Sequence, residues 1–441
     1  MKILVVSWYF PPANTMGALR LGKLVKYLLS NGHDVRVVCG RDLPRHQTLA
    51  VEVPQDRIFT TPWRHDNGLR ETVTQFRCSV GQLMRSLVSR RSDVTDAIAA
   101  VSGSAADNAE APARVSALRA LAIDLTSYPD ERVAWLPHAY RGVREALKEW
   151  RPDIVLASAP PFSVLAVGAR VARTLGVPWV AEYRDRWAED PYRAVSPWRR
   201  TLEHRLEDAL VADASGIATV SEPWAADYRA RWGKPTIVVY NGFDPEDFPL
   251  DYEPAADDPD HLNIVYTGIL YPGRRDPTPV FQALALMGPA AQGVRVRFYG
   301  SDPETVRQLA TAQGVEHLVE AHGRVPYDDS IRLQQQADVL LLMQWNNPKE
   351  QGNCPGKLFG YIAVRRPVLA LGLEDGVPAQ ILGDRGAGEI INEPSAVARR
   401  IETWLAEKHS TGRIAALPAT VRDGLSRWDQ YAKLEQFLEG I

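Results

Sequence analysis

The second half of the chain contains two cationic turns that could bind a diphosphate. The first turn follows a strand-like run and offers four suitable residues: Gly268, Gly273, Arg274 and Arg275. Glycine lets the backbone approach an anion, and arginine supplies a two-pronged donor. The second turn is a glycine-marked helix start carrying Lys357 and Leu358, where free N–H groups and the helix dipole favour negative charge. Two such elements predict a nucleotide-diphosphate ligand.

A second group of polar residues lies in the first half of the chain. Glu182, Arg184 and Asp185 come at the end of a strand-like run over 178–183, and ligands of open α/β sheets bind at the carboxyl ends of the strands. Asp185 is the best candidate for orienting or deprotonating a hydroxyl group, although Arg184 could instead hold it in a structural pair. Gly17 follows the first strand, where it would let a ligand approach the backbone or would only ease the turn.

The elements that must position these residues alternate between short apolar runs and helical patterns. A βαβ unit is predicted at the start, with strands over 2–7 and 34–39. The alternation indicates an α/β domain over 1–240, interrupted by an insertion at about 62–129, and it restarts over 260–415. Two parallel-sheet domains of this kind imply a cleft between them.

Composition narrows the class of protein. A length of 441 residues suits two domains rather than one core. With 51 basic and 54 acidic residues, the net charge of -3 gives no overall attraction to nucleic acid. Three cysteines without pairing or metal-ligand spacing fit a reducing compartment, and the apolar run at the N-terminus is too short for a secretion signal. We therefore expect a cytoplasmic protein without a membrane-spanning segment.

One predicted helix, over 69–91, carries apolar and basic residues on different sides. Its apolar residues are Phe76, Val80, Leu83, Met84, Leu87 and Val88. Such a helix can lie in the surface of a membrane, and the pattern predicts a peripheral contact with the inner membrane face. An ordinary surface helix packed on its own domain explains the same pattern.

Several segments, taken in order, resemble the retaining family 4 of the GT-B glycosyltransferases. They are Phe10-Pro11-Pro12 with Gly17 and Arg20, Asn241-Gly242-Phe243-Asp244, Gly273-Arg274-Arg275, Phe298-Tyr299-Gly300, Pro355-Gly356-Lys357-Leu358-Phe359 and Arg366-Pro367-Val368-Leu369-Ala370. The resemblance implies that the domain at 260–415 holds a nucleotide-diphosphate sugar and that the domain at 1–240 holds the acceptor. It also implies that a final helix within 416–441 packs back on the first domain.

The resemblance assigns the predicted site residues to two substrates. The donor contacts fall on Gly17, Gly268, Arg274, Arg275, Glu350, Lys357 and Leu358. Residues 178–187 are similar to a segment of bacterial polysaccharide and glycolipid transferases, which favours a saccharide, lipid-linked or small-molecule acceptor. The expected acceptor contacts are Arg20, Glu182, Arg184 and Asp185.

The resemblance also implies transfer with retention and without a cofactor. Asp257, Asp258 and Asp260 lie in the linker between the domains rather than in a strand-end loop, so no metal site is predicted. The departing diphosphate must then be stabilised by Arg275 and Lys357, with Arg274 as the alternate.

The chain departs from the family pattern at Gly360, where relatives place a glutamate that holds the nucleotide ribose. The usual partner position is Gly352, and Glu350 is close to it but out of register. Loss of a charge-assisted ribose contact costs about 1.5–3 kcal/mol of binding. A non-catalytic GT-B protein that binds a nucleotide sugar or acts as a scaffold is therefore the alternative to a transferase.

Overall fold

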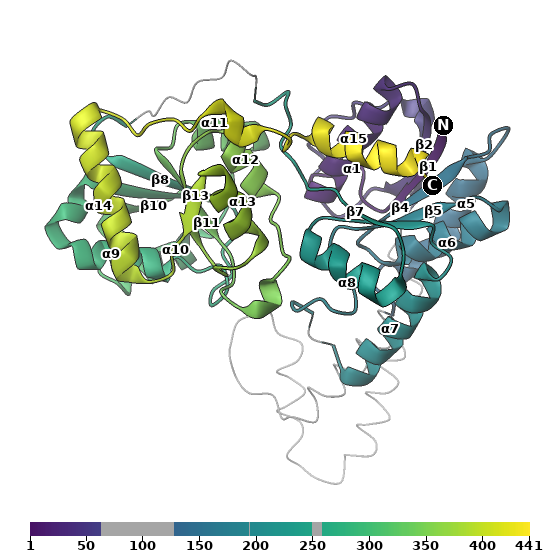
Figure 1. Cartoon of the computed structure of the whole chain (residues 1–441), viewed down its shortest axis with the longest axis horizontal. Helices are drawn as coiled ribbons and strands as arrows, with labels where there is room; N and C mark the ends of the chain where they lie inside the picture. The colour runs from purple at the N-terminus through teal and green to yellow at the C-terminus, as the bar shows by residue number, and fades with distance from the viewer. Residues whose placement is uncertain (63–127, 194, 249–257) are drawn as a thin grey trace, which may run out of the picture.

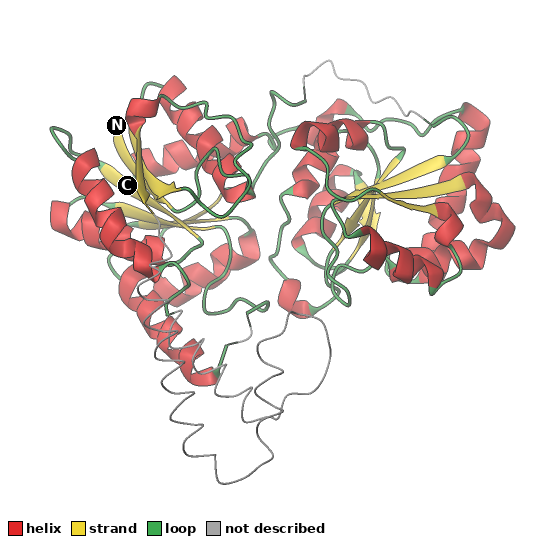
Figure 2. Cartoon of the chain, turned by 180° about the vertical axis from the view of Figure 1, so that it is seen from behind, coloured by secondary structure: helices red, strands yellow, loops and turns green. Residues whose placement is uncertain are grey.

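The computed structural model describes residues 1–62, 128–193, 195–248 and 258–441, which form two lobes (Figure 1). Each lobe is a parallel sheet with helices on both faces, as Figure 2 shows. The first sheet has the strand order β3-β2-β1-β4-β5-β6-β7 and the second has the order β10-β9-β8-β11-β12-β13. The predicted pair of Rossmann-like sheet domains is confirmed.

The first lobe is built on seven strands and five helices among the residues described. The strands are β1 (Lys2–Ser7), β2 (Asp34–Arg41), β3 (Ile58–Pro62), β4 (Ile154–Ala159), β5 (Trp179–Tyr183), β6 (Gly216–Thr219) and β7 (Thr236–Val238). The helices are α1 (Met16–Ser30), α5 (Leu136–Ala146), α6 (Ser163–Leu175), α7 (Pro197–Val211) and α8 (Glu222–Trp232).

The second lobe repeats this architecture. Its strands are β8 (Leu262–Thr267), β9 (Val294–Tyr299), β10 (Val319–Ala321), β11 (Val339–Met343), β12 (Val368–Leu371) and β13 (Gly388–Ile390). Its helices are α9 (Thr278–Met287), α10 (Pro303–Thr311), α11 (Tyr327–Gln335), α12 (Lys357–Ala363), α13 (Val377–Arg385) and α14 (Pro394–Thr411).

The central strands are apolar because helices cover both of their faces. Every residue of β4 and β11 is buried, and so is β1 after its first residue. In the first sheet Val5 of β1 pairs with Val37 of β2 and with Leu156 of β4. Continuous apolar runs of this kind are typical of strands inside a parallel sheet. The register brings the carboxyl ends of the strands in each lobe to one edge.

The last helix, α15 (Arg427–Glu439), returns from the second lobe and packs on α1 of the first (Figure 1). The Tyr431 hydroxyl donates to the Arg20 carbonyl at 2.8 Å, and Leu434 and Leu438 join the apolar cluster that contains Ile3 and Val5. The expected final helix within 416–441 begins at Arg427, because the Ser426 side chain caps it by accepting from the N–H of Asp429.

Two connections between the lobes lie side by side and are hydrogen-bonded to each other. The N–H of Phe243 donates to the Leu425 carbonyl at 3.1 Å, and the N–H of Arg427 donates to the Phe243 carbonyl at 2.7 Å. Gly242 has φ of +61°, and a Cβ there would lie 2.9 Å from the Arg427 nitrogen. Glycine is required at this crossing because a side chain would separate the two segments.

The predicted insertion at about 62–129 and the amphipathic helix over 69–91 fall almost wholly outside the described residues. Within the ranges that the structure does describe, no helix is long and apolar enough to cross a membrane.

Truncation of Leu434 should destabilise the first lobe. Leu434→Ala removes a fully buried side chain between α15 and the sheet, and we expect a loss of about 2–5 kcal/mol of unfolding free energy. The control is Lys433→Ala, one residue away on the exposed side of the helix, for which we expect a change within about 0.5 kcal/mol. Urea denaturation followed by circular dichroism measures both, and equal midpoints would contradict the packing of α15.

Candidate active site

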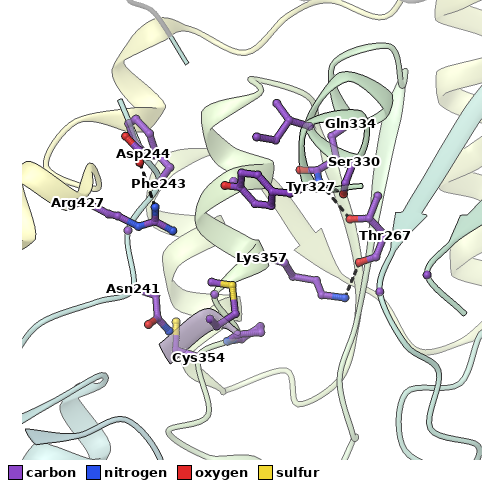
Figure 3. A pocket seen from close by; sticks show the side chains of 18 of the residues that line it. Asn241, Phe243, Asp244, Thr267, Tyr327, Ser330, Gln334, Cys354, Lys357 and Arg427 are labelled. Carbon is purple, nitrogen blue, oxygen red and sulfur yellow. Dashed lines mark hydrogen bonds and ion pairs between the residues drawn. The ribbon is translucent and has the colours of Figure 1, made fainter. Parts of the chain in front are cut away.

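A cavity of about 580 Å³ lies between the lobes, lined by residues of both (Figure 3). On the first lobe its wall includes Gly17, Arg184 and Asp185, which follow β1 and β5. On the second lobe it includes Gly268, Arg275 and Lys357. All six are predicted site residues. They meet because they follow the carboxyl ends of the strands in the two lobes, which is where ligands of open α/β sheets bind. We call this space the first cavity.

Lys357 is the first residue of α12 and reaches toward the end of β8 (Figure 3). Its Nζ donates to the Thr267 carbonyl at 2.7 Å and lies 4.3 Å from the centre of the Tyr266 ring. No carboxylate in the described part of the chain is within ion-pair distance of it. Burial, with a smaller contribution from the charge of Arg275, lowers the pKa of the Lys357 amine to about 7.

Gly268 provides the space that Lys357 occupies. It has φ of +148°, and a Cβ added there would lie 2.1 Å from the lysine Nζ. A glycine at this turn thus has two reasons, the backbone conformation and the room for the amine. Gly268 was predicted to let the backbone come close to a ligand. In the structure, the missing side chain also makes room for the Lys357 amine.

The two arginines of the first turn diverge. Arg275 lines the first cavity, 5.1 Å from the centre of the Tyr271 ring, and none of the ion pairs found among the described residues includes it. Arg274 instead contacts two aromatic rings that are themselves in contact, 4.7 Å from the centre of Tyr192 and 4.6 Å from that of Trp345. Of the predicted pair, only Arg275 faces the same space as Lys357.

Arg184 and Asp185 form the opposite wall. The Arg184 guanidinium rests on Gly17, where a Cβ would lie 1.7 Å from its Nη1, and it donates to the Pro160 carbonyl. No ion pair joins it to Asp185, although both residues are described. Asp185 is an exposed residue that lines the cleft. The protein around it partly desolvates its carboxyl and raises the pKa, while the charge of Arg184 partly opposes the rise.

Arg20 and Glu182 lie behind this wall rather than in it. Both are buried and form an ion pair at 2.8 Å. Arg20 also donates to the carbonyls of Val239 and Tyr240, which ties α1 to the end of the first lobe. Burial by itself would raise the pKa of Glu182, but the charge of Arg20 brings it below the usual value. The pair supports the strand end that carries Arg184 and Asp185.

Two predicted donor contacts also lie away from the first cavity. The Leu358 side chain is fully buried in the core of the second lobe, and its N–H donates to the Pro355 carbonyl at 3.0 Å. Glu350 lines a second cavity of about 620 Å³ instead. The two cavities share Asp185, Arg275 and Asn353, so they form one continuous cleft.

Gly360 does line the first cavity, and no carboxylate replaces the missing glutamate there. A Cβ at Gly360 would meet only Oε1 of Gln334, at 3.6 Å. The Gln334 Nε2 donates to Thr267 Oγ1 at 3.3 Å and to Ser330 Oγ at 3.1 Å. An uncharged amide oxygen therefore faces the position where the family pattern has a glutamate.

Sequence reasoning missed the wall of the first cavity nearest the connections between the lobes. Asn241, Asp244 and Arg427 lie there (Figure 3), and Arg427 approaches Asp244 at 3.3 Å. The turn at 241–244 was one of the segments that carry the family resemblance, which is a signal for this wall. No local pattern marks Arg427, because only the return of α15 brings it to the cleft.

Among the described residues, one group of side chains has the spacing of a metal site: His33, Glu435 and Glu439. The group joins α15 to the first lobe and lines neither cavity. His33 and Glu435 are already hydrogen-bonded to each other at 2.6 Å.

Comparison with known proteins identifies the fold. The family model of the glycosyl transferase 4-like domain matches residues 76–242, and no curated protein matches the chain. Among solved structures, sucrose-phosphate synthase from Thermosynechococcus elongatus aligns with a TM-score of 0.64 and 14% identity, over 100% of this chain and 98% of that one.

Two further solved structures align over 100% of both chains. HepE from Anabaena, solved in complex with UDP and glucose, has a TM-score of 0.59 and 15% identity. WaaG, a glycosyltransferase involved in lipopolysaccharide biosynthesis, has a TM-score of 0.57 and 13% identity. The predicted resemblance is confirmed. Residues 76–242 are similar to the glycosyl transferase 4-like domain, and the chain has the GT-B fold of the solved structures to which it is similar.

Proposed function

We propose that this protein transfers a sugar from a nucleoside-diphosphate sugar to a hydroxyl group of an acceptor. One observation carries the proposal: Lys357 and Arg275 face the same cavity between the lobes, and no ion pair of the described residues includes either of them. The family-model match and the UDP in the HepE complex support the same class of donor.

The two cations act on the leaving group. When the bond between the sugar carbon and the diphosphate oxygen breaks, its electron pair stays on the diphosphate, and fixed positive charges stabilise that product. Both cations come from the second lobe, Arg275 from the loop after β8 and Lys357 from α12. We propose that they do this without a metal ion.

Asp185 acts on the acceptor from the opposite wall. Asp185 lines the cavity, and partial desolvation by the surrounding protein raises the pKa of its carboxyl, which makes it a stronger base than a fully solvated aspartate. It takes the proton of the attacking hydroxyl while the new bond to the sugar carbon forms. Retention at that carbon is implied by the family resemblance and is part of the proposal. It requires the hydroxyl to attack from the same face of the sugar that the diphosphate leaves.

Cellular location belongs to the proposal as well. A cytoplasmic protein with a peripheral contact at the inner membrane face, made by residues 69–91, fits the composition and charge pattern of the sequence.

The alternative is a non-catalytic protein that binds a nucleotide sugar or acts as a scaffold. Gly360 favours it, since the first cavity has the amide of Gln334 where the family pattern has a carboxylate. The experiments below separate the two functions, because a scaffold can bind a nucleotide but releases none from a sugar donor.

Removal of either cation should weaken binding of uridine diphosphate and slow transfer. We expect Arg275→Ala and Lys357→Met to raise its Kd at least tenfold, by loss of a charge-assisted contact worth about 1.5–3 kcal/mol. In turnover assays with UDP-sugars, each change should lower kcat by about 10²–10³-fold. Calorimetry measures the Kd, and release of uridine diphosphate from the UDP-sugar measures kcat, with Lys433→Ala as the control for both. Normal binding in both variants would refute the assigned diphosphate site.

Binding of uridine diphosphate should weaken as the pH rises through about 7. The Lys357 amine in the free protein has its pKa lowered to about 7, so it is charged below that pH and neutral above it. A bound diphosphate raises this pKa, so binding above pH 7 must take up a proton and loses up to about tenfold in affinity per pH unit. Calorimetry from pH 6 to 9 measures the Kd for wild type and for Lys357→Met. The ratio of the two Kd values at each pH removes the effect of the ligand's own ionisation. Parallel curves for the two proteins would contradict the role of this amine.

Substitution of Asp185 should affect the chemical step and leave the donor bound. We expect Asp185→Asn to lower kcat by about 10²–10⁴-fold, the usual contribution of a general base, while the Kd of uridine diphosphate stays within threefold of wild type. The pH profile of kcat/KM should also lose its acidic limb. A fall in kcat below about tenfold would assign the acceptor proton to the leaving phosphate oxygen instead.

A further inference from the structure

The part of the first cavity beyond Lys357 has to accommodate the pentose of a nucleoside diphosphate. We propose that Gln334 binds this pentose in place of the missing carboxylate, and that the site holds only one of the two ribose hydroxyl groups. This inference rests on the proposed function, because it names the ligand class that the same donor site would take. A nucleotide that lacks the other hydroxyl group is then bound as well as the ribonucleotide.

The pentose of a bound nucleotide would lie beside Gly360. In a nucleoside diphosphate the pentose is bonded directly to the diphosphate, for which Lys357 is the proposed partner. Gly360 lies three residues further along α12, so it is on the same face of the helix as Lys357, and both line the first cavity. The cavity continues along α11, which contributes Tyr327, Ser330 and Gln334 to its wall (Figure 3). The space next to the diphosphate is therefore the space between α12 and α11.

Gln334 presents an unpaired oxygen to this space. The residue is only 8% exposed, and its Nε2 donates to Ser330 Oγ at 3.1 Å and to Thr267 Oγ1 at 3.3 Å. Thr267 Oγ1 in turn lies 3.1 Å from the Tyr361 hydroxyl, so a chain of buried groups fixes the amide. None of the hydrogen bonds found among the described residues uses Oε1, which lies 3.6 Å from the place of a Cβ at Gly360. A ligand hydroxyl that donates to this oxygen would satisfy it.

An amide in this position differs from a carboxylate in the number of hydroxyl groups that it can hold. A carboxylate has two acceptor oxygens, so it can accept from both hydroxyl groups of a ribose at once. The amide of Gln334 has one acceptor oxygen, and its nitrogen is already used within the protein. The contact is also uncharged, and such a hydrogen bond is weaker than one to a carboxylate. One hydroxyl group is therefore held, and the other is not recognised by this side chain.

The carboxylates near the first cavity are engaged elsewhere. Among the described residues, Asp185 and Asp244 line it. Asp244 is paired with Lys23 at 3.0 Å and with Arg427 at 3.3 Å. Asp185 belongs to the opposite wall, on the first lobe, and Glu350 lines the second cavity. No carboxylate of the described residues thus replaces the missing glutamate, and the amide is the acceptor that faces its place.

The test measures by calorimetry the Kd of three ligands for the full chain: uridine diphosphate, its 2′-deoxy analogue and its 3′-deoxy analogue. We expect one analogue to bind within about threefold of uridine diphosphate and the other to bind more weakly than that, because it has lost one neutral hydrogen bond. A loss of more than about threefold for both analogues, or for neither, would overturn the proposal.

Two variants assign this discrimination to the amide. In Gln334→Met, which keeps the size of the side chain but removes its oxygen, all three ligands should bind within about threefold of one another. In Gly360→Glu, which restores a carboxylate, both analogues should lose about tenfold or more relative to uridine diphosphate, because the contact becomes charge-assisted. The matched control is Gln308→Met, an exposed glutamine on α10, which should behave as wild type. Discrimination that persists in Gln334→Met would overturn the inference, and so would an unchanged preference in Gly360→Glu.

Binding of inorganic diphosphate separates this inference from the proposed function. Inorganic diphosphate has no pentose, so its Kd should stay the same in Gln334→Met, which also reports that the variant is folded. Weaker binding of inorganic diphosphate in that variant would mean that Gln334 only maintains the shape of the cavity, and would overturn the inference. Failure of the proposed function would instead appear as normal binding of both inorganic diphosphate and uridine diphosphate in Arg275→Ala.

Discussion

The arrangement of the cleft depends on one positive charge, the Lys357 amine, which the described residues hold without a counter-ion. Among the residues that the structure describes, the partners of the Lys357 amine are the Thr267 carbonyl and the Tyr266 ring, and its lowered pKa reflects the cost of that burial. A cation kept in such a place is stabilised when an anion arrives. The open backbone at Gly268 gives the amine its position, so the turn and the helix start act as one unit.

The two walls of the cleft face each other because the chain crosses between the lobes twice. The paired segments at Phe243 and Leu425 fix the crossing, and α15 then anchors the end of the chain on α1. Asp244 sits at this point, held by Lys23 at 3.0 Å and by Arg427 at 3.3 Å. One side of the first cavity and the connection between the lobes therefore share residues, among them Asp244 and Arg427.

Much of the fold and part of the site follow from local patterns. Continuous apolar runs identify strands buried inside parallel sheets, and the carboxyl ends of those strands must share an edge. Gly268, Arg275 and Lys357 are placed together on this basis, and so are Arg184 and Asp185. Local patterns do not reveal that Arg274 turns toward two aromatic rings or that Glu350 lines a different cavity.

The sequence alone determined the two parallel-sheet lobes and the two cationic turns of the second lobe. Buried strands, helix starts and glycine turns depend on neighbours in the chain, so local patterns reveal them. Only the tertiary structure decided which charges are free to meet a ligand. Arg20 is neutralised by Glu182, a residue 162 positions away, whereas Lys357 has no such partner within the described ranges. Pairing of charges depends on distances through space, and burial then sets the energy of whatever charge remains unpaired.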